Sequence, residues 1–392
     1  MTAVLIISII LFLIYAALII YYRQGWVSMP SFDATALGGE HTTKISVIIP
    51  ARNEGQNIKA CLDSIRAQSY PPDLFEVIVV NDHSTDNTAE LIESAAGAGG
   101  CNIKRIDLAD HIDASLNAYK KKAIEVGIQR STAELIVTTD ADCVVPPQWL
   151  HTIATFYEAY HPAFIAAPVS INCSNRFIEK FQALDFMVLQ GITGAAVHKQ
   201  MHNMCNGANL AYERTAFEAV NGFMGIDNIA SGDDMLLMHK IYKQYPTKVL
   251  FLKSKDIIVQ TAPVYTIREF FQQRIRWASK ADKFGDKSLF PVLLIVYLFN
   301  LMMLALPVIA IFKNWQLPIV NCQLSILGLW LWMLLLKIVI ELAFIYPVAK
   351  FFGKQNMLRI FPLMQPFSIV YTVIAGWLGK FGSYEWKGRK VF

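Results

Sequence analysis

The sequence predicts an α/β domain built on a doubly wound parallel sheet and flanked by transmembrane helices. Short β-branched runs alternate with helical periodicity through the first two thirds of the chain, as strand–helix–strand units do. Long uncharged runs lie at the N-terminus and after residue 288. The chain has 392 residues, 54% of them hydrophobic, and a mean hydropathy of +0.37, which is high for a purely soluble protein.

The chain begins with an apolar run, Ala3–Tyr22, that is long enough to span a bilayer. A secretory signal peptide is the alternative, but the run has no basic start, is too long, and is followed by no small-residue cleavage site. We therefore expect a retained transmembrane helix over residues 1–22 and a linker over residues 23–43. Arg23 directly after the span predicts that the following domain is cytoplasmic.

The central stretch is Glu134–Pro146, a buried-strand pattern that ends in Asp140-Ala141-Asp142. Ligands of open α/β sheets bind at the carboxyl ends of the strands. In extended backbone, residues two apart point the same way, so Asp140 and Asp142 can bind one hard divalent cation that bridges to a diphosphate. The alternative is that the two aspartates lie in an ordinary solvated turn.

Two earlier strands, Lys44–Pro50 and Phe75–Val80, each precede a helical pattern. Asp82 and Asp86 follow the second strand, where they either accept hydrogen bonds from a base or ribose, or cap the next helix. The chain has no GxGxxG, which disfavours a dinucleotide site of the usual type.

Three later motifs are ambiguous by themselves. The triplet Lys120–Lys122 is either a solvated face or places one lysine against a diphosphate. The stretch Met204–Ala211 is either a strand and turn or a glycine-bearing segment that lets backbone approach a ligand closely. In Ser231–Asp234, two acids precede a helical run, where acids ordinarily cap the helix.

The last third of the chain is dominated by apolar segments. Tyr265–Lys283 is basic, aromatic and helical in period, as in a helix at the membrane interface. Leu289–Phe312 and Leu324–Tyr346 are long enough to cross, and Ile360–Leu378 is a third candidate. A full third crossing would put the basic tail outside, against the positive-inside rule, so we expect Ile360–Leu378 to be re-entrant or interfacial. A true crossing is the alternative.

Charge is unevenly distributed. From Leu289 onwards the net charge is +7, which leaves −3 for the residues before it in a chain of +4. A mildly acidic soluble domain argues against a nucleic-acid partner, whereas basic residues beside apolar spans suit anionic lipid. Lys337 and Glu341 lie four residues apart inside a span and can form either a functional or a structural ion pair. The six cysteines have no metal-ligand spacing and are expected to be reduced, on the cytosolic side.

Seven short motifs together carry a family resemblance. They are SVIIPARNE, VVNDHSTDNT, KKKA, TTDAD, NGANLAYER, SGDD and QRIRW, and they occur in this order between residues 46 and 277. In this order they resemble family-two glycosyltransferases with the GT-A fold. The resemblance implies transfer of a sugar from a nucleotide-sugar donor, commonly a UDP-sugar, with inversion at the anomeric carbon.

The resemblance also implies roles for individual residues. Mg²⁺ or Mn²⁺ would be the cofactor, held by Asp140 and Asp142. Asp234 matches the catalytic base, and Asp233 departs from the glutamate usual at its position, so that Asp233 as the base stays an alternative. Asp82 would contact uracil, Lys122 would contact the nucleotide or the diphosphate, and Asn209 would contact the donor. Gln273, Arg276 and Trp277 match a QxxRW motif of the active site, in which Arg276 would neutralise the leaving diphosphate and Trp277 would line the acceptor site.

We therefore expect a metal-dependent inverting glycosyltransferase that acts on a membrane lipid or a short-chain acceptor, beside the bilayer. The alternatives are a processive polysaccharide synthase with a glycan acceptor, and a non-catalytic membrane scaffold that keeps the fold. The expected parts of the chain after the linker are a catalytic domain, an interfacial helix, a membrane region and a basic tail, over residues 44–264, 265–288, 289–378 and 379–392.

Overall fold

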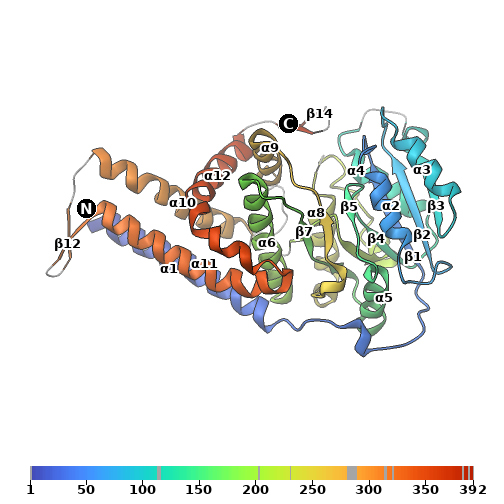
Figure 1. Cartoon of the computed structure of the whole chain (residues 1–392), viewed down its shortest axis with the longest axis horizontal. Coiled ribbons are helices and arrows are strands. Elements are labelled where there is room, and N and C mark those ends of the chain that lie inside the picture. The colour runs from blue at the N-terminus through green and yellow to red at the C-terminus, as the bar shows by residue number, and fades with distance from the viewer. Residues whose placement is uncertain are drawn as a thin grey trace.

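A mixed seven-stranded sheet lies beside a bundle of long helices, on the right of Figure 1. The computed structural model describes residues 2–112, 116–201, 204–229, 231–279, 289–312, 316–319, 322–381, 384–386 and 389–391. The strand order is β3-β2-β1-β4-β8-β6-β9. The bounds of these strands are Asn102–Asp107, Phe75–Asn81, Ile45–Ala51, Leu135–Thr138, Leu210–Glu213, Phe164–Ala166 and Val249–Phe251.

The predicted parallel pairing is confirmed for one half of this sheet. β1 pairs in parallel with both β2 and β4, and β2 with β3, whereas β8 is antiparallel to β4 and β6. The sheet is therefore mixed, because β8, which lies within the NGANLAYER motif, runs antiparallel to both of its neighbours. A small second sheet joins β5, β10 and β7, which are Cys143–Val144, Val259–Thr261 and Val169–Ile171.

Helices α2 to α9 and the sheet together form the sheet domain. The central strands are buried along almost their whole length, as their β-branched runs predict. Helices α2 to α9 span Ile58–Arg66, Thr88–Gly97, Tyr119–Arg130, Trp149–Tyr160, Phe177–His198, Arg214–Ala219, Asp233–Gln244 and Ile267–Ala278.

Four helices of the described chain are long and apolar enough to cross a membrane. They are α1, α10, α11 and α12, spanning Thr2–Ser28, Leu289–Phe312, Ile326–Phe352 and Phe361–Phe381. The first helix continues through Ser28, six residues beyond the predicted end of the anchor, so the linker is shorter than expected. The N-terminus and the hairpin of β11 and β12 (Gln316–Ile319 and Cys322–Ser325) lie together at the end of the bundle far from the sheet domain (Figure 1).

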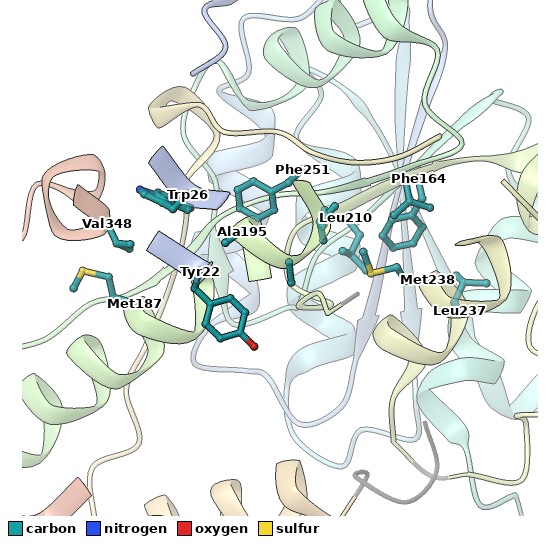
Figure 2. Close-up of a cluster of buried hydrophobic side chains, with 14 of the residues drawn as sticks. Tyr22, Trp26, Phe164, Met187, Ala195, Leu210, Leu237, Met238, Phe251 and Val348 are labelled. Carbon is teal, nitrogen blue, oxygen red and sulfur yellow. The ribbon is translucent and has the colours of Figure 1, made fainter. Parts of the chain in front are cut away.

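One hydrophobic core joins this bundle to one face of the sheet. Trp26 at the end of α1 packs edge to face on Phe251 of β9 and on Phe351 of α11. Figure 2 shows Trp26 beside Ala195 of α6 and Val348 of α11, in a cluster that continues to the sheet residues Phe164 and Leu210. The anchor and the sheet domain are therefore one packed body rather than two parts joined by a tether.

Polar side chains buried between the membrane helices hold one another. The Lys337 ammonium lies 2.7 Å from Glu341 Oε1 and 2.5 Å from Gln365 Oε1, and Gln365 Nε2 donates to Glu341 Oε2 at 2.8 Å. Tyr15 of α1 donates its hydroxyl to Glu341. The predicted Lys337–Glu341 ion pair is present, and its links to Gln365 and Tyr15 tie α11 to α12 and α1, because each polar group is costly there without a partner.

Both ends of α12 contact the sheet domain. Before the helix, Lys354 Nζ donates to the carbonyl of Ile171 in β7 at 2.7 Å. Near the other end, Gly379 packs so closely on α9 that a side-chain carbon there would lie 2.5 Å from Ala278 Cβ. Between these points Gln365 meets Glu341, which lies about 16 Å along α11 from the end of that helix. The segment thus contacts the sheet domain before α12 and near its end, and contacts α11 between these points.

Candidate functional site

A pocket of about 1070 Å³ lies at the carboxyl ends of β1, β2 and β4, with α9 and the start of α8 as its further walls. This is the edge at which parallel strands deliver side chains to ligands. The predicted site residues that line the pocket are Asp82, Asp140, Asp142, Asp233, Asp234, Gln273, Arg276 and Trp277. Residues separated by almost 200 positions in sequence therefore share one cavity.

Asp140 and Asp142 follow β4 and lie in the pocket wall. The Lys120 ammonium contacts Asp140 Oδ1 at 2.7 Å and Asp233 Oδ2 at 3.1 Å. Burial would lower the pKa of Lys120, but Asp140, Asp233 and Asp234 raise this pKa well above its ordinary value. Lys120 is therefore a permanent cation between the strand edge and α8.

Asp233 and Asp234 form the first turn of α8, after Gly232 at a φ of +80° that favours glycine. Asp234 accepts hydrogen bonds from the N–H groups of Gly207, at 3.2 Å, and of Met235, at 2.7 Å. A side-chain carbon at Gly207 would lie 3.3 Å from Asp233 Oδ2. The glycine thus allows the close backbone approach that the sequence left open.

Asp82 is buried at the end of β2. Arg52 donates to the Asp82 carbonyl at 3.0 Å, and His83 Nδ1 lies 3.0 Å from Asp82 Oδ1. Both Asp82 and Arg52 line the pocket. Asp86, by contrast, accepts from Thr88 and Gly55 and holds the start of α3, as its capping interpretation predicts.

Helix α9 closes the pocket on the side of the membrane bundle. Its N-terminus has a capping box between Thr266 and Glu269, which fixes where the helix begins. Gln273, Arg276 and Trp277 then lie on the face of α9 that lines the cavity. The Trp277 ring also packs on Phe186 of α6, with the ring centroids 5.9 Å apart.

The pocket carries an excess of negative charge. Seven acidic residues line it against three basic ones, which are Arg52, Lys120 and Arg276. An anionic ligand such as a diphosphate is repelled by this surplus unless cations accompany it. The arrangement therefore fits a ligand that brings a metal ion.

The donor set at Asp140 and Asp142 fits Mg²⁺ or Mn²⁺. Both are hard cations that take carboxylate oxygens and are commonly held by one or two carboxylates together with substrate phosphates. No cluster of three or more metal-binding side chains occurs in the described part of the chain. The remaining ligands would therefore be oxygen atoms of a bound phosphate or water.

The three lysines of the triplet have three different environments. Lys120 lines the pocket, whereas Lys122 lies outside its lining and pairs with Glu125 at 2.9 Å. Lys121 is buried and donates to the carbonyls of Ile226, Ile229 and Ser231 at 2.5 to 3.0 Å. It thereby holds the loop that leads into Asp233. Of the three lysines, only Lys120 lines the pocket, whereas Lys122, of which a ligand contact was expected, does not.

Asn209 is also outside the pocket lining. It is fully buried, accepts from Trp149 Nε1 at 2.9 Å, and donates to the carbonyls of Pro168 and Ile257 at 2.8 Å each. These bonds join β8 to α5 and to the segments beside β7 and β10. Its place is structural, and no periodicity in the sequence signals it.

Sequence reasoning missed Arg52 and Glu54 as pocket residues. Both follow β1, whose carboxyl end lies beside those of β2 and β4. The same rule that selected Asp82 and Asp140 could have found them.

Two family models of glycosyltransferases match the sequence of this chain. The model of Glycosyl transferase family 2 matches residues 46–220, and that of Glycosyl transferase family group 2 matches residues 135–375. The poly-beta-1,6-N-acetyl-D-glucosamine synthase of Staphylococcus epidermidis is 24% identical over 258 residues, 64% of this chain and 57% of that protein. An undecaprenyl-phosphate 4-deoxy-4-formamido-L-arabinose transferase of Proteus mirabilis is 31% identical over 123 residues, 31% of this chain and 36% of that protein.

The chain thus spans less than two thirds of the length of either relative.

A solved structure is similar over nearly the whole chain. The mannosyltransferase PcManGT from Pyrobaculum calidifontis, in complex with GDP-Man and Mn²⁺, aligns over 94% of this chain and 98% of its own. The TM-score is 0.57 and the sequence identity 19%, which shows a shared fold.

The roles of the lysine triplet can be tested by substitution. Lys121→Met removes a buried donor from three carbonyls, and we expect a loss of about 2–3 kcal/mol in the free energy of unfolding. Lys122→Met removes a surface pair and should change it by less than about 0.5 kcal/mol. Denaturant unfolding in detergent measures both, and equal effects would contradict the assignment.

Proposed function

Because the chain belongs to glycosyl transferase family group 2, we propose that it transfers a sugar from a nucleotide-sugar donor to an acceptor at the membrane. The observation that carries this proposal is the single pocket that joins Asp140 and Asp142 to Asp234 and Arg276. A non-catalytic scaffold that kept the fold would have no need to retain these charged residues together in a cavity.

The donor is expected to lie along the strand edge. Asp82 at the end of β2 would contact the base, for which a uracil N–H is a suitable donor. The diphosphate would lie at Asp140 and Asp142 with Mg²⁺ or Mn²⁺, which offsets the charge of the phosphates when bound. Lys120 lies 2.7 Å from Asp140 and is well placed to transfer its contact to a phosphate oxygen.

Asp234 is proposed as the base of an inverting transfer. The acceptor oxygen attacks the anomeric carbon from the side opposite the donor phosphate, its hydroxyl proton passes to Asp234, and the bond to the phosphate oxygen breaks. The neutral N–H donors of Gly207 and Met235 orient the Asp234 carboxylate, whereas Asp233 shares the cation Lys120. Asp234 is thus the better placed of the two to accept a proton.

Arg276 would stabilise the charge that develops on the leaving diphosphate, since it lines the same cavity from α9. Gln273 lies beside it, and Trp277 offers an indole face on which a sugar can stack. These three residues form the wall nearest the membrane bundle, so the acceptor is proposed to bind there.

We propose a membrane lipid or a short-chain glycan as the acceptor. Tyr265 lines the pocket and Ile267 follows it at the start of α9, and their side chains are about 60% exposed. Such exposed apolar side chains at the mouth of a polar pocket suit an acceptor that approaches from lipid. The relative that is named an undecaprenyl-phosphate transferase supports this choice.

Extension of a polysaccharide is the second candidate. It is favoured by the 24% identical relative, which is named a poly-beta-1,6-N-acetyl-D-glucosamine synthase and aligns with 64% of this chain. The two candidates differ in where the transferred sugar accumulates.

We also propose that the sheet domain lies on the cytoplasmic side, with α12 re-entrant. Three crossings by α1, α10 and α11 would put the N-terminus and the β11–β12 hairpin outside. Lys350, Lys354, Arg359 and Lys380 would then be on the side of the sheet domain, as the positive-inside rule requires. Cys322 on β12 would lie outside, unlike the cytosolic position expected of all six cysteines.

Transfer can be tested directly on the purified protein in lipid. We expect label from one of a panel of radiolabelled UDP- and GDP-sugars to enter the organic-extractable fraction when Mn²⁺ and undecaprenyl phosphate are present. EDTA should abolish the transfer, because the surplus of carboxylates in the pocket repels a bare diphosphate.

Asp234→Asn is the matched variant for this assay, with the exposed Asp73→Asn as control. The first should abolish transfer while nucleotide binding persists, and the second should leave both unchanged. Label in a high-mass polymer would replace the lipid acceptor with a glycan. Transfer that survives EDTA, or loss of nucleotide binding in Asp234→Asn, would contradict the assigned roles.

The topology is tested by cysteine labelling in intact cells, in a Cys322→Ser background. Gln355→Cys and Lys380→Cys, at the two ends of the α12 segment, should both resist a membrane-impermeant maleimide until the cells are opened. Thr2→Cys should react without opening. Reaction of Lys380→Cys in intact cells would show that α12 crosses.

A further inference from the structure

A buried polar junction connects the re-entrant helix α12 to the pocket wall. Arg274 of α9 is 4% exposed, and its guanidinium lies 2.7 Å from Asp185 Oδ2 of α6. Tyr371 of α12 donates its hydroxyl to the other oxygen, Asp185 Oδ1. Three helices that are distant in sequence therefore meet at one carboxylate.

The guanidinium also stacks on aromatic rings of its own helix. Its central carbon lies 4.2 Å from the ring centroid of Trp277 and 4.8 Å from that of Phe270. Arg274 is one turn before Trp277, so both lie on the same side of α9. Arg274 Nη1 further donates to Gln273 Oε1 at 3.4 Å.

None of the three polar residues of the junction lines the pocket, whereas Gln273 and Trp277 do. A buried ion pair is costly unless its geometry is good and its remaining oxygen atoms are bonded. The Tyr371 hydroxyl donates to Asp185 Oδ1, whereas Asp185 Oδ2 and Arg274 Nε and Nη2 have no hydrogen-bond partner within the described structure. The charges of the pair and the Tyr371 bond therefore hold this junction. Packing alone does not explain why a costly buried ion pair is present here, because aromatic rings already fill the surroundings. The ring centroids of Phe181, Phe270 and Phe367 lie 4.7 to 5.8 Å from one another.

We propose that Tyr371, Asp185 and Arg274 form a positioning relay through which the membrane-embedded helix α12 sets the orientation of Trp277 in the pocket wall. The relay rests on the proposed function only in naming that wall as the acceptor side. Arg274 acts through Trp277 and Gln273, Asp185 acts through Arg274, and Tyr371 fixes Asp185 from the bilayer side. A displacement of α12 in the lipid would thus reach the acceptor wall without touching the donor half.

A second contact of α6 fixes the segment that leads into α9. Gln182 of α6, one turn before Asp185, donates to the Val264 carbonyl at 2.8 Å and accepts from the Val264 N–H at 3.0 Å. These two bonds hold the segment between β10 and α9. The start of α9 is therefore tied to α6 independently of the relay, and Tyr371 bears on the later turn that holds Trp277.

The relay is tested first by a measurement that needs no acceptor. With 5-fluorotryptophan incorporated, the ¹⁹F resonance of Trp277 is assigned as the one lost in Trp277→Phe. Tyr371→Phe, which removes one hydroxyl, should shift this resonance, and so should Asp185→Asn. Tyr346→Phe is the matched control, since Tyr346 on α11 is 57% exposed, and it should leave the resonance in place. Melting temperatures confirm that each variant is folded.

The second readout uses undecaprenyl phosphate as the acceptor probe. Tyr371→Phe should raise the KM for this acceptor about tenfold, the effect expected of one hydrogen bond to a charged group, and leave the KM for the donor unchanged. Arg274→Lys, which keeps the charge but loses the planar fork, should do the same. A resonance of Trp277 that stays in place in both Tyr371→Phe and Asp185→Asn overturns the relay. A wild-type protein that transfers no sugar contradicts the proposed function instead, and the resonances still decide the relay.

Discussion

The ammonium of Lys120 between Asp140 and Asp233 is the interaction on which the pocket depends. It joins the carboxyl edge of the sheet to the first turn of α8, at 2.7 Å from Asp140 and 3.1 Å from Asp233. Without a cation at this point, Asp140, Asp233 and Asp234 would repel one another across the cavity. The metal ion and the phosphate oxygens of the proposed donor would compete with Lys120 for Asp140, so donor binding would change the contacts of this cation.

The packing of the core places the pocket close to the apolar helices. Trp26, Phe251 and Val348 belong to one packed cluster, so α1 and α11 are extensions of the sheet domain (Figure 2). Helix α9 lies between that domain and α12, and its pocket-lining face holds Arg276 and Trp277. The wall that we propose for the acceptor is therefore shared by the sheet domain and the bundle of apolar helices.

The sheet edge that carries the pocket and three of the long apolar helices could be predicted from the sequence. Buried-strand runs that end in carboxylates predicted the sheet edge, and long apolar runs predicted α1, α10 and α11. These signals are local, and periodicity reads local structure well. The family resemblance, carried by seven motifs in order, is confirmed by a family model that matches residues 135–375.

What could not be predicted depends on contacts across the fold. The triplet Lys120–Lys122 gives no local reason for choosing one lysine, because only the register of α4 against α8 decides which ammonium enters the pocket. The antiparallel direction of β8 and the structural place of Asn209 follow from tertiary pairing. Asp185 and Tyr371 belong to no motif, and only the meeting of α6, α9 and α12 brings them to Arg274.

The most direct test of the account is a structure of the protein with UDP and Mn²⁺, collected at a wavelength where manganese gives an anomalous signal. We expect a manganese peak at Asp140 and Asp142, with the diphosphate against it and Lys120 moved from Asp140 towards a phosphate oxygen. A nucleotide bound elsewhere, or bound in this pocket with the Lys120–Asp140 contact intact and no manganese peak, would contradict it.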